Sequence, residues 1–189
     1  PPRSTLFPYT TLFRSEIQPE AQVGVAVNYR SFKPARSWSL LDRIPCSFQG
    51  QIFNNAFHDA LVDGKLNLVL KKVHIPEAAK SQDYIGVNYY SRDLVKFDIR
   101  KPGEMFGSRS YPKDALLSAT GFIANIPEGM FDALKWAHKY DLPIYVTENG
   151  VEDDKDTMRP RYTIEHLLQV WRDRKSTRLN SSHGKLSRM

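Results

Sequence analysis

Three short runs of apolar residues mark candidate strands along the chain. Residues 23–27 are Val-Gly-Val-Ala-Val followed by Asn28, residues 83–90 end in an asparagine and two tyrosines, and residues 144–147 are Ile-Tyr-Val-Thr. Short continuous apolar runs are typical of strands that are buried on both faces, as in a parallel sheet. We therefore predict three buried parallel strands at these positions.

Apolar residues recur at helical spacing in three other segments. The first stripe is followed by Gly64, where a C-terminal cap belongs, and consists of Phe53, Ala56, Phe57, Ala60 and Leu61. The second helix is expected to begin at Pro127 and to bury Met130, Leu134 and Ala137. The third consists of Ile164, Leu167, Leu168 and Trp171.

Residues 97–124 combine weak periodicity with many Gly, Pro and Ser residues, which is typical of a long surface loop. The order of the regular segments is strand, helix, strand, helix, strand, helix. This alternation predicts an α/β fold with a parallel sheet. Three strands cannot close a barrel, because closure needs about eight.

Both ends of the chain differ from its middle. Residues 5–15 and 173–183 resemble translations of the two common short-read sequencing adapters, in different frames. We therefore interpret 1–15 and 173–189 as non-native tails without a helical or strand pattern to bury, and 16–172 as the natural protein. The alternative is a real extended arm and a disordered basic tail.

The net charge of +6 over 189 residues would suggest a nucleic-acid partner. The two tails account for this excess, so residues 16–172 are neutral overall and we expect no nucleic-acid binding. The single cysteine, Cys46, excludes an intrachain disulfide and fits a reducing compartment. No apolar run is long enough to span a membrane, and we expect a cytoplasmic location.

Glu148 stands at the end of the third predicted strand, in Thr147-Glu148-Asn149-Gly150. Ligands bind at the carboxyl ends of parallel strands, and barrel enzymes keep their catalytic groups there. A carboxylate at this position is held by a rigid element and directed at a cleft. By periodicity alone, the alternative is an acid that caps the next segment or pairs with a lysine.

Several motifs in order resemble glycoside hydrolase family 1, the β-glucosidase family. Residues 143–150 resemble its nucleophile signature, 83–91 its sixth strand, 23–28 its fifth strand and 55–61 the helix region between them. Residues 126–130 and 159–167 resemble the stretches before and after the seventh strand. The resemblance implies an incomplete (β/α)8 TIM barrel, comprising about strands 5 to 7 with their helices.

The resemblance implies that Glu148 is the nucleophile of a retaining β-glycosidase and forms a glycosyl-enzyme intermediate. Tyr90 matches the tyrosine that hydrogen-bonds this carboxylate, and Asn88 matches a pocket asparagine. For Asn88, a purely local role at the strand end is an equal alternative. Tyr89 alternates to the other face and is expected to pack, and Asn28 is expected to be structural.

The sequence departs from the family at one decisive point. The acid/base of family 1 lies in an Asn-Glu-Pro motif, which is absent from this chain. We expect the chain to begin after that motif and also to lack the eighth strand. The parent would be a retaining β-glycosidase, whereas this fragment would be inactive and poorly soluble or only partly folded.

Two other assignments remain open. The parent could be another TIM-barrel glycosidase, or a non-catalytic sugar-binding relative that has lost its acid/base. The histidines show no metal-ligand spacing, so no metal or other cofactor is expected. The expected partner is a small-molecule β-glycoside, and the oligomeric state is left unassigned. Trp136 and Trp171 are expected in the core or between helices.

Overall fold

A computed structural model of the chain describes the backbone of residues 17–186 and the side chains of residues 17–176. The predicted N-terminal tail, 1–15, lies outside the described residues. The strands are β1 (Gly24–Pro34), β2 (Lys65–Asn67), β3 (Lys72–His74), β4 (Tyr84–Phe97), β5 (Gly107–Ser110) and β6 (Ile144–Glu148). The longer helices are α2 (Leu40–Gly50), α3 (Ala56–Asp63), α4 (Glu128–His138) and α5 (Arg159–Leu186).

Strand β4 is the centre of the main sheet. It pairs in parallel with β1 on one side and with β6 on the other, and its second half pairs antiparallel with β5. The predicted parallel arrangement of the three apolar runs is confirmed. Strands β1 and β4 are longer than predicted, so Asn28 lies within β1 rather than at its end. The pattern of apolar residues did not predict the separate hairpin of β2 and β3.

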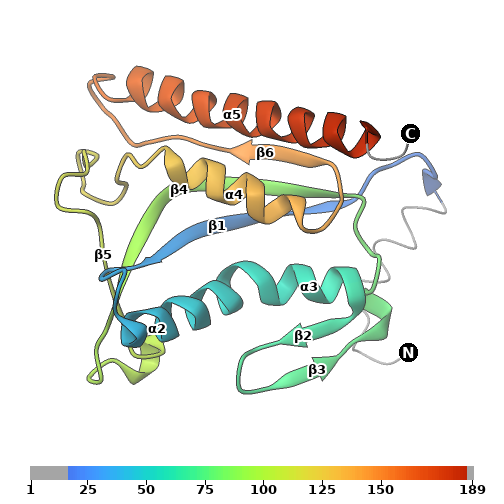
Figure 1. Cartoon of the computed structure of the whole chain (residues 1–189), viewed down its shortest axis with the longest axis horizontal. Helices are drawn as coiled ribbons and strands as arrows, with labels where there is room; N and C mark the ends of the chain where they lie inside the picture. The colour runs from blue at the N-terminus through green and yellow to red at the C-terminus, as the bar shows by residue number, and fades with distance from the viewer. Residues whose placement is uncertain (1–16, 187–189) are drawn as a thin grey trace.

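In Figure 1, α5 runs alongside β6 and the α2–α3 run lies below β1. Helix α4 packs on the central strand, and its predicted core residues Met130, Leu134 and Ala137 are buried. They contact Ile85, Val87, Tyr89 and Tyr29 of the sheet. Tyr89 is fully buried, so its predicted packing role is confirmed.

Gly129 in the first turn of α4 makes room for the ring of Tyr89. A Cβ atom at this position would lie 1.8 Å from the Tyr89 hydroxyl oxygen. That hydroxyl donates a hydrogen bond of 2.7 Å to the carbonyl of Ile126. Glycine is therefore needed here because the helix start approaches the central strand too closely for any side chain.

Helix α2 was missed because its inner face is polar. The buried residues are Asp42, Pro45 and Gln49, whereas Leu40, Leu41 and Ile44 are exposed. Asp42 accepts hydrogen bonds from the Arg36 side chain at 2.7 and 2.8 Å and from the Phe97 amide at 2.9 Å. The Arg36 hydrogen bonds hold the pKa of the Asp42 carboxyl well below its usual range.

The stripe predicted from Phe53 to Leu61 is only partly correct. Ala56, Ala60 and Leu61 are buried, but Phe53 and Phe57 are 46% and 43% exposed. Residues Gln51–Asn55 form a π-helix, η1, which adds a residue to the turn and rotates the side chains before it. Gly64 is the predicted cap, with φ 75° and its amide bonded to Ala60.

Residues 97–124 are mainly irregular, as predicted, although they contain a 3-10 turn, η3 (Pro102–Glu104), and β5. A second 3-10 turn, η2 (Pro76–Ala78), follows the hairpin. No helix in the described part of the chain combines the length and the hydrophobicity of a bilayer-spanning segment.

Helix α5 differs from the expected pattern in two respects. It continues to Leu186, so the segment 173–189 is helical over most of its length, and Asp173 is buried with a 2.9 Å contact to His138. The residues expected to form its core face are 52–60% exposed; we call Ile164, Leu167, Leu168 and Trp171 the α5 apolar stripe. The face turned inward instead carries Tyr162, His166, Gln169 and Asp173.

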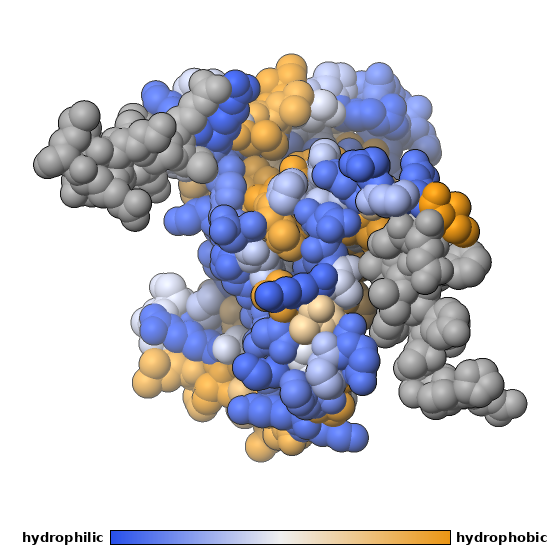
Figure 2. Space-filling view, turned by 90° about the vertical axis from the view of Figure 1, so that its right-hand side faces the viewer, coloured by the Kyte–Doolittle hydropathy of each residue, from blue (hydrophilic) through white to orange (hydrophobic). Residues whose placement is uncertain are grey.

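Strand β6 is also more exposed than predicted. Tyr145 and Val146 are 50% and 40% exposed, because among the described residues β6 pairs only with β4. A parallel sheet is normally covered on both faces and continued by neighbours. Figure 2 shows hydrophobic residues interrupting the polar surface on the face it displays. The chain therefore leaves strand edges and apolar side chains in contact with water.

These exposed groups predict that the isolated chain self-associates. Sedimentation velocity at increasing protein concentration should show a rising average mass, and an apolar dye should bind at low concentration. Replacing Leu168 and Trp171 by glutamine should reduce this association, because it removes part of the α5 apolar stripe. A monomer that melts in one cooperative transition would contradict the prediction.

Candidate functional site

Strand β4 has a bulge at Tyr90, one of the residues expected in the functional site. Tyr29 pairs with Tyr89 and Ser31 pairs with Arg92, so Tyr90 and Ser91 together stand opposite the single residue Arg30. An extra residue of this kind bends a strand and redirects its side chains, and such bulges are frequent next to active sites.

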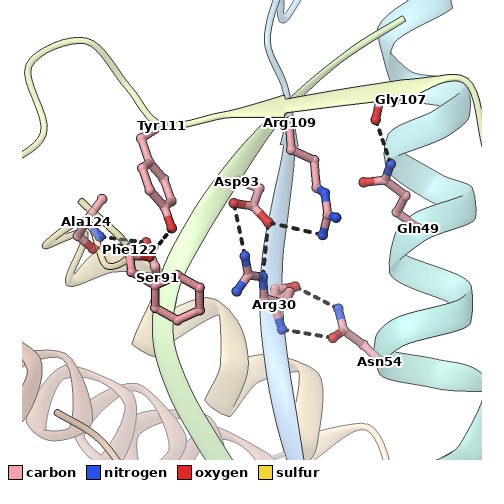
Figure 3. Close-up of polar contacts among 10 residues, drawn as sticks. All are labelled: Arg30, Gln49, Asn54, Ser91, Asp93, Gly107, Arg109, Tyr111, Phe122 and Ala124. Atoms are coloured by element: carbon pink, nitrogen blue, oxygen red, sulfur yellow. Dashed lines mark hydrogen bonds and ion pairs between the residues drawn. The ribbon is translucent and has the colours of Figure 1, made fainter. Parts of the chain in front are cut away.

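The bulge in β4 is fixed from both sides, as Figure 3 shows. The Asn54 side chain, supplied by η1, bonds the amide of Arg30 at 3.0 Å and its carbonyl at 2.8 Å. The Arg30 guanidinium donates to Asp93 at 3.0 Å. Across the bulge, the Ser91 hydroxyl bonds the carbonyl and the amide of Ala124 at 3.0 and 3.2 Å. The irregular backbone is therefore supported by side chains.

A second bulge, in β6, brings Glu148 to the same place. Val146 pairs with Val87 but Glu148 pairs with Asn88, which leaves Thr147 as the extra residue. The Tyr90 hydroxyl donates a hydrogen bond to Glu148 Oε2. The two residues singled out in the sequence are therefore joined directly, although 58 positions separate them.

Tyr90 is a hydrogen-bond donor at neutral pH. Its hydrogen bond to Glu148, together with partial burial, raises the pKa of Tyr90 to about 12. Loss of the proton would place two negative charges side by side, which explains the direction of the shift. The phenol therefore stays protonated and orients one carboxylate oxygen, and Glu148 remains exposed to whatever occupies the site.

Asn88 lies beside this pair, because it is the register partner of Glu148. Its Oδ1 atom accepts a hydrogen bond of 2.5 Å from the Thr147 hydroxyl, and the side chain is half-buried. Because the carbonyl oxygen is held by Thr147, the amide nitrogen is the atom that could donate to a ligand. Both the local role and the ligand role expected for Asn88 fit this geometry.

Three residues behind the site had no assigned role in the sequence. Asn149 Nδ2 lies 2.7 Å from the carbonyl oxygen of Tyr89, 2.8 Å from His166 Nδ1 and 3.3 Å from the Tyr162 hydroxyl. The Tyr162 hydroxyl donates to the carbonyl of Tyr90 at 2.8 Å. Tyr162 and His166 are four positions apart, which places them on one helix face. This spacing could have identified the inward face from the sequence. The α5 apolar stripe, however, led the sequence analysis to assign a different face to the core.

The arrangement can perform nucleophilic chemistry. A carboxylate stands at the end of a strand, exposed on one side and oriented by a phenol donor on the other. Such a group can attack an electrophilic carbon and later leave as a carboxylate. The described residues contain no cluster of three or more histidine, cysteine or acidic side chains placed to hold a metal.

The sequence was compared with models of known families. The model described as glycosyl hydrolase family 1 matches residues 9–177, which is most of the chain. The chain belongs to glycosyl hydrolase family 1. This membership decides between family 1 and the alternative of another barrel glycosidase.

Curated members of family 1 include several similar proteins. A β-galactosidase from Pyrococcus woesei is 36% identical over 128 residues, which cover 59% of this chain and 25% of the relative. β-Glucosidase A from Thermotoga maritima is 32% identical over 186 residues, covering 85% of this chain and 40% of the relative. The chain thus spans well under half the length of these relatives.

Solved family 1 structures share the fold. A β-glycosidase from Pyrococcus horikoshii superposes with a TM-score of 0.76 at 28% identity, over 89% of this chain and 39% of that chain. A family 1 β-glucosidase from Thermotoga maritima gives 0.77 at 27% identity, over 89% and 42%. A further Thermotoga maritima structure is complexed with a cyclophellitol analogue that mimics a transition state. These enzymes are (β/α)8 barrels, of which this family 1 chain forms a part.

Proposed function

We propose that this chain is part of a retaining β-glycosidase and that Glu148 is its nucleophile. The carboxylate of Glu148 attacks the anomeric carbon of a β-glycoside, and the bond from that carbon to the aglycone oxygen breaks. The aglycone oxygen takes a proton from an acid/base group. Water then gives a proton back to the acid/base group and attacks the same carbon, the carboxylate leaves, and the sugar is released with its configuration retained.

The contact between Tyr90 and Glu148 is the observation that carries this proposal. It joins the two residues that the family motif assigns to the nucleophile and its partner, through two strand bulges that nothing in the general barrel fold requires. Asn88 is the register partner of Glu148 on the neighbouring strand and is proposed to contact the sugar. The supported substrate class is a β-glycoside, as the names of the similar enzymes suggest.

We also propose that β1, β4 and β6 correspond to the fifth, sixth and seventh strands of the barrel. Retaining hydrolysis needs a second carboxyl group about 5–5.5 Å from the nucleophile. The sequence contains no Asn-Glu-Pro motif, which supplies that group in family 1. The acid/base would therefore come from outside this chain, and the chain by itself is expected to be inactive.

Trapping the covalent intermediate tests the assignment of Glu148. The enzyme that carries this segment should be labelled by a 2-deoxy-2-fluoro-β-glycoside with a good leaving group, since fluorine slows release of the sugar. Mass spectrometry should find the label on the peptide containing Glu148. Glu148→Gln should abolish labelling and lower kcat/KM by roughly 10³-fold or more, because the attacking group is lost.

Glu152→Gln is the matched control for this experiment. Glu152 lies four positions further on, and the hydroxyls of Ser118 and Thr120 donate to it, so it is a carboxylate of the same loop with its own partners. The control should still be labelled on Glu148. A label on any other residue would refute the assignment of Glu148. A protein that binds β-glycosides without turnover or labelling would also refute it.

Tyr90→Phe tests the role of the phenol. A hydrogen bond to a charged group contributes about 1.5–3 kcal/mol, so its loss should slow the step in which the carboxylate leaves by roughly 10- to 100-fold. The glycosyl-enzyme should then accumulate, and kcat and KM should fall together for substrates with good leaving groups. Rapid-quench measurement of the intermediate checks this outcome. Unchanged release of the sugar would show that Tyr90 does not assist Glu148.

A further inference from the structure

We infer that Asn149 and two buried residues, Tyr162 and His166, form a clamp that positions Tyr90 and Glu148 from the side of helix α5. The inference rests on the proposed function and adds positioning residues to it. Each bonds the backbone of β4 or the residue that directly follows the nucleophile.

The orientation of the Asn149 amide follows from its neighbours. The carbonyl oxygen of Tyr89 can only accept, and it lies 2.7 Å from Asn149, so the amide nitrogen must face it. The same nitrogen lies 2.8 Å from His166 Nδ1. His166 must therefore accept at Nδ1, and its ring proton must reside on Nε2.

The environment of His166 supports this neutral form. The side chain is 1% exposed, and burial lowers the pKa of His166 to about 4. Its ring lies against Tyr162 with a centroid separation of 3.8 Å and against Tyr89 at 5.6 Å. Protonation at Nδ1 would place two donors against each other, so the contact with Asn149 needs an unprotonated Nδ1.

Tyr162 completes the clamp on the next residue of β4. Its ring is fully buried, and its hydroxyl proton goes to the carbonyl of Tyr90 at 2.8 Å. Two successive carbonyls of β4, those of Tyr89 and Tyr90, are therefore bonded by Asn149, directly after β6, and by Tyr162 of α5. These carbonyls lie where β4 bulges and where Tyr90 turns toward Glu148.

Packing alone does not explain a histidine at position 166. Its Nε2 atom is buried and has no hydrogen-bond partner among the described residues. A buried donor without a partner destabilises a fold, and leucine would fill a comparable space without that cost. What histidine adds is the acceptor at Nδ1. The chemistry of that atom, rather than ring volume, is what the site uses.

His166→Leu and His166→Asn separate positioning from packing in the enzyme that carries this segment. Leucine fills the space but has no acceptor, whereas asparagine places an oxygen near the position of Nδ1. His166→Leu should lower kcat by roughly 10- to 100-fold with little change in KM, since small displacements of reacting groups have effects of that size. His166→Asn should recover most of the rate, although it should melt at the same or a lower temperature than His166→Leu.

His58→Leu is the matched control. His58 is also fully buried, and burial lowers the pKa of His58 to about 4, but its ring lies between Trp136 and Tyr140 of α4 and the segment after it. Its replacement should leave kcat unchanged. Asn149→Asp is the second variant should His166→Leu not fold; it removes the donor to Tyr89 and should lower kcat in the same way.

A ring-nitrogen spectrum of the ¹⁵N-histidine-labelled enzyme gives a reading that is independent of activity. His166, assigned through His166→Asn, should show a proton on Nε2 and none on Nδ1. A proton on Nδ1, or a His166→Leu enzyme that is as fast as the unchanged enzyme while His166→Asn is slow, would overturn the clamp. If the fluorosugar labels a residue other than Glu148, the proposed function fails instead, and the spectrum still decides the clamp.

Discussion

The rest of the structure depends on the pairing of β4 with two parallel neighbours. Because β1 and β6 both bond to β4, their register decides which residues meet at the strand ends. The pairing of β4 with β1 has one bulge at Tyr90, and the pairing of β4 with β6 has another next to Asn88. Each bulge shifts the register by a single residue. Since side chains alternate between faces, a shift of one residue changes which group points into the site. The contact of Tyr90 with Glu148 is a consequence of these two local irregularities.

The bulges are stable because polar side chains take the place of regular ladder bonds. Asn54 bonds both backbone groups of Arg30, Ser91 bonds Ala124, and the Asn149 and Tyr162 side chains bond two carbonyls of β4. Buried backbone groups must be paired, so each irregular residue needs a partner of this kind. The inner faces of α2 and α5 are polar for a related reason. The side chains on these faces bond loops and strand ends instead of packing into a hydrophobic core.

The same polar inner faces explain where the reading of the sequence was wrong. Helix α2 was overlooked, and the apolar stripe of α5 was assigned to the core although it is exposed. Periodicity identifies an amphipathic helix by its apolar side and assumes that this side is covered by protein. In a chain that spans only part of the length of its relatives, the apolar sides of α5 and β6 face water among the described residues, whereas His166 and Tyr162 are buried.

The sequence by itself determined the parallel α/β character, the helix that follows Pro127 and the family, through ordered local motifs that need no partner to be recognised. It also singled out Glu148, Tyr90 and Asn88. The family resemblance already implied a hydrogen bond from Tyr90 to Glu148. Only the tertiary structure decided that two strand bulges align these residues, that the Thr147 hydroxyl donates to the side-chain carbonyl of Asn88, and that α5 binds the backbone behind them. Those contacts join residues 13 to 72 positions apart. They depend on strand register and on bulges, which arise when strands pair and are not encoded in the spacing of residues along one segment.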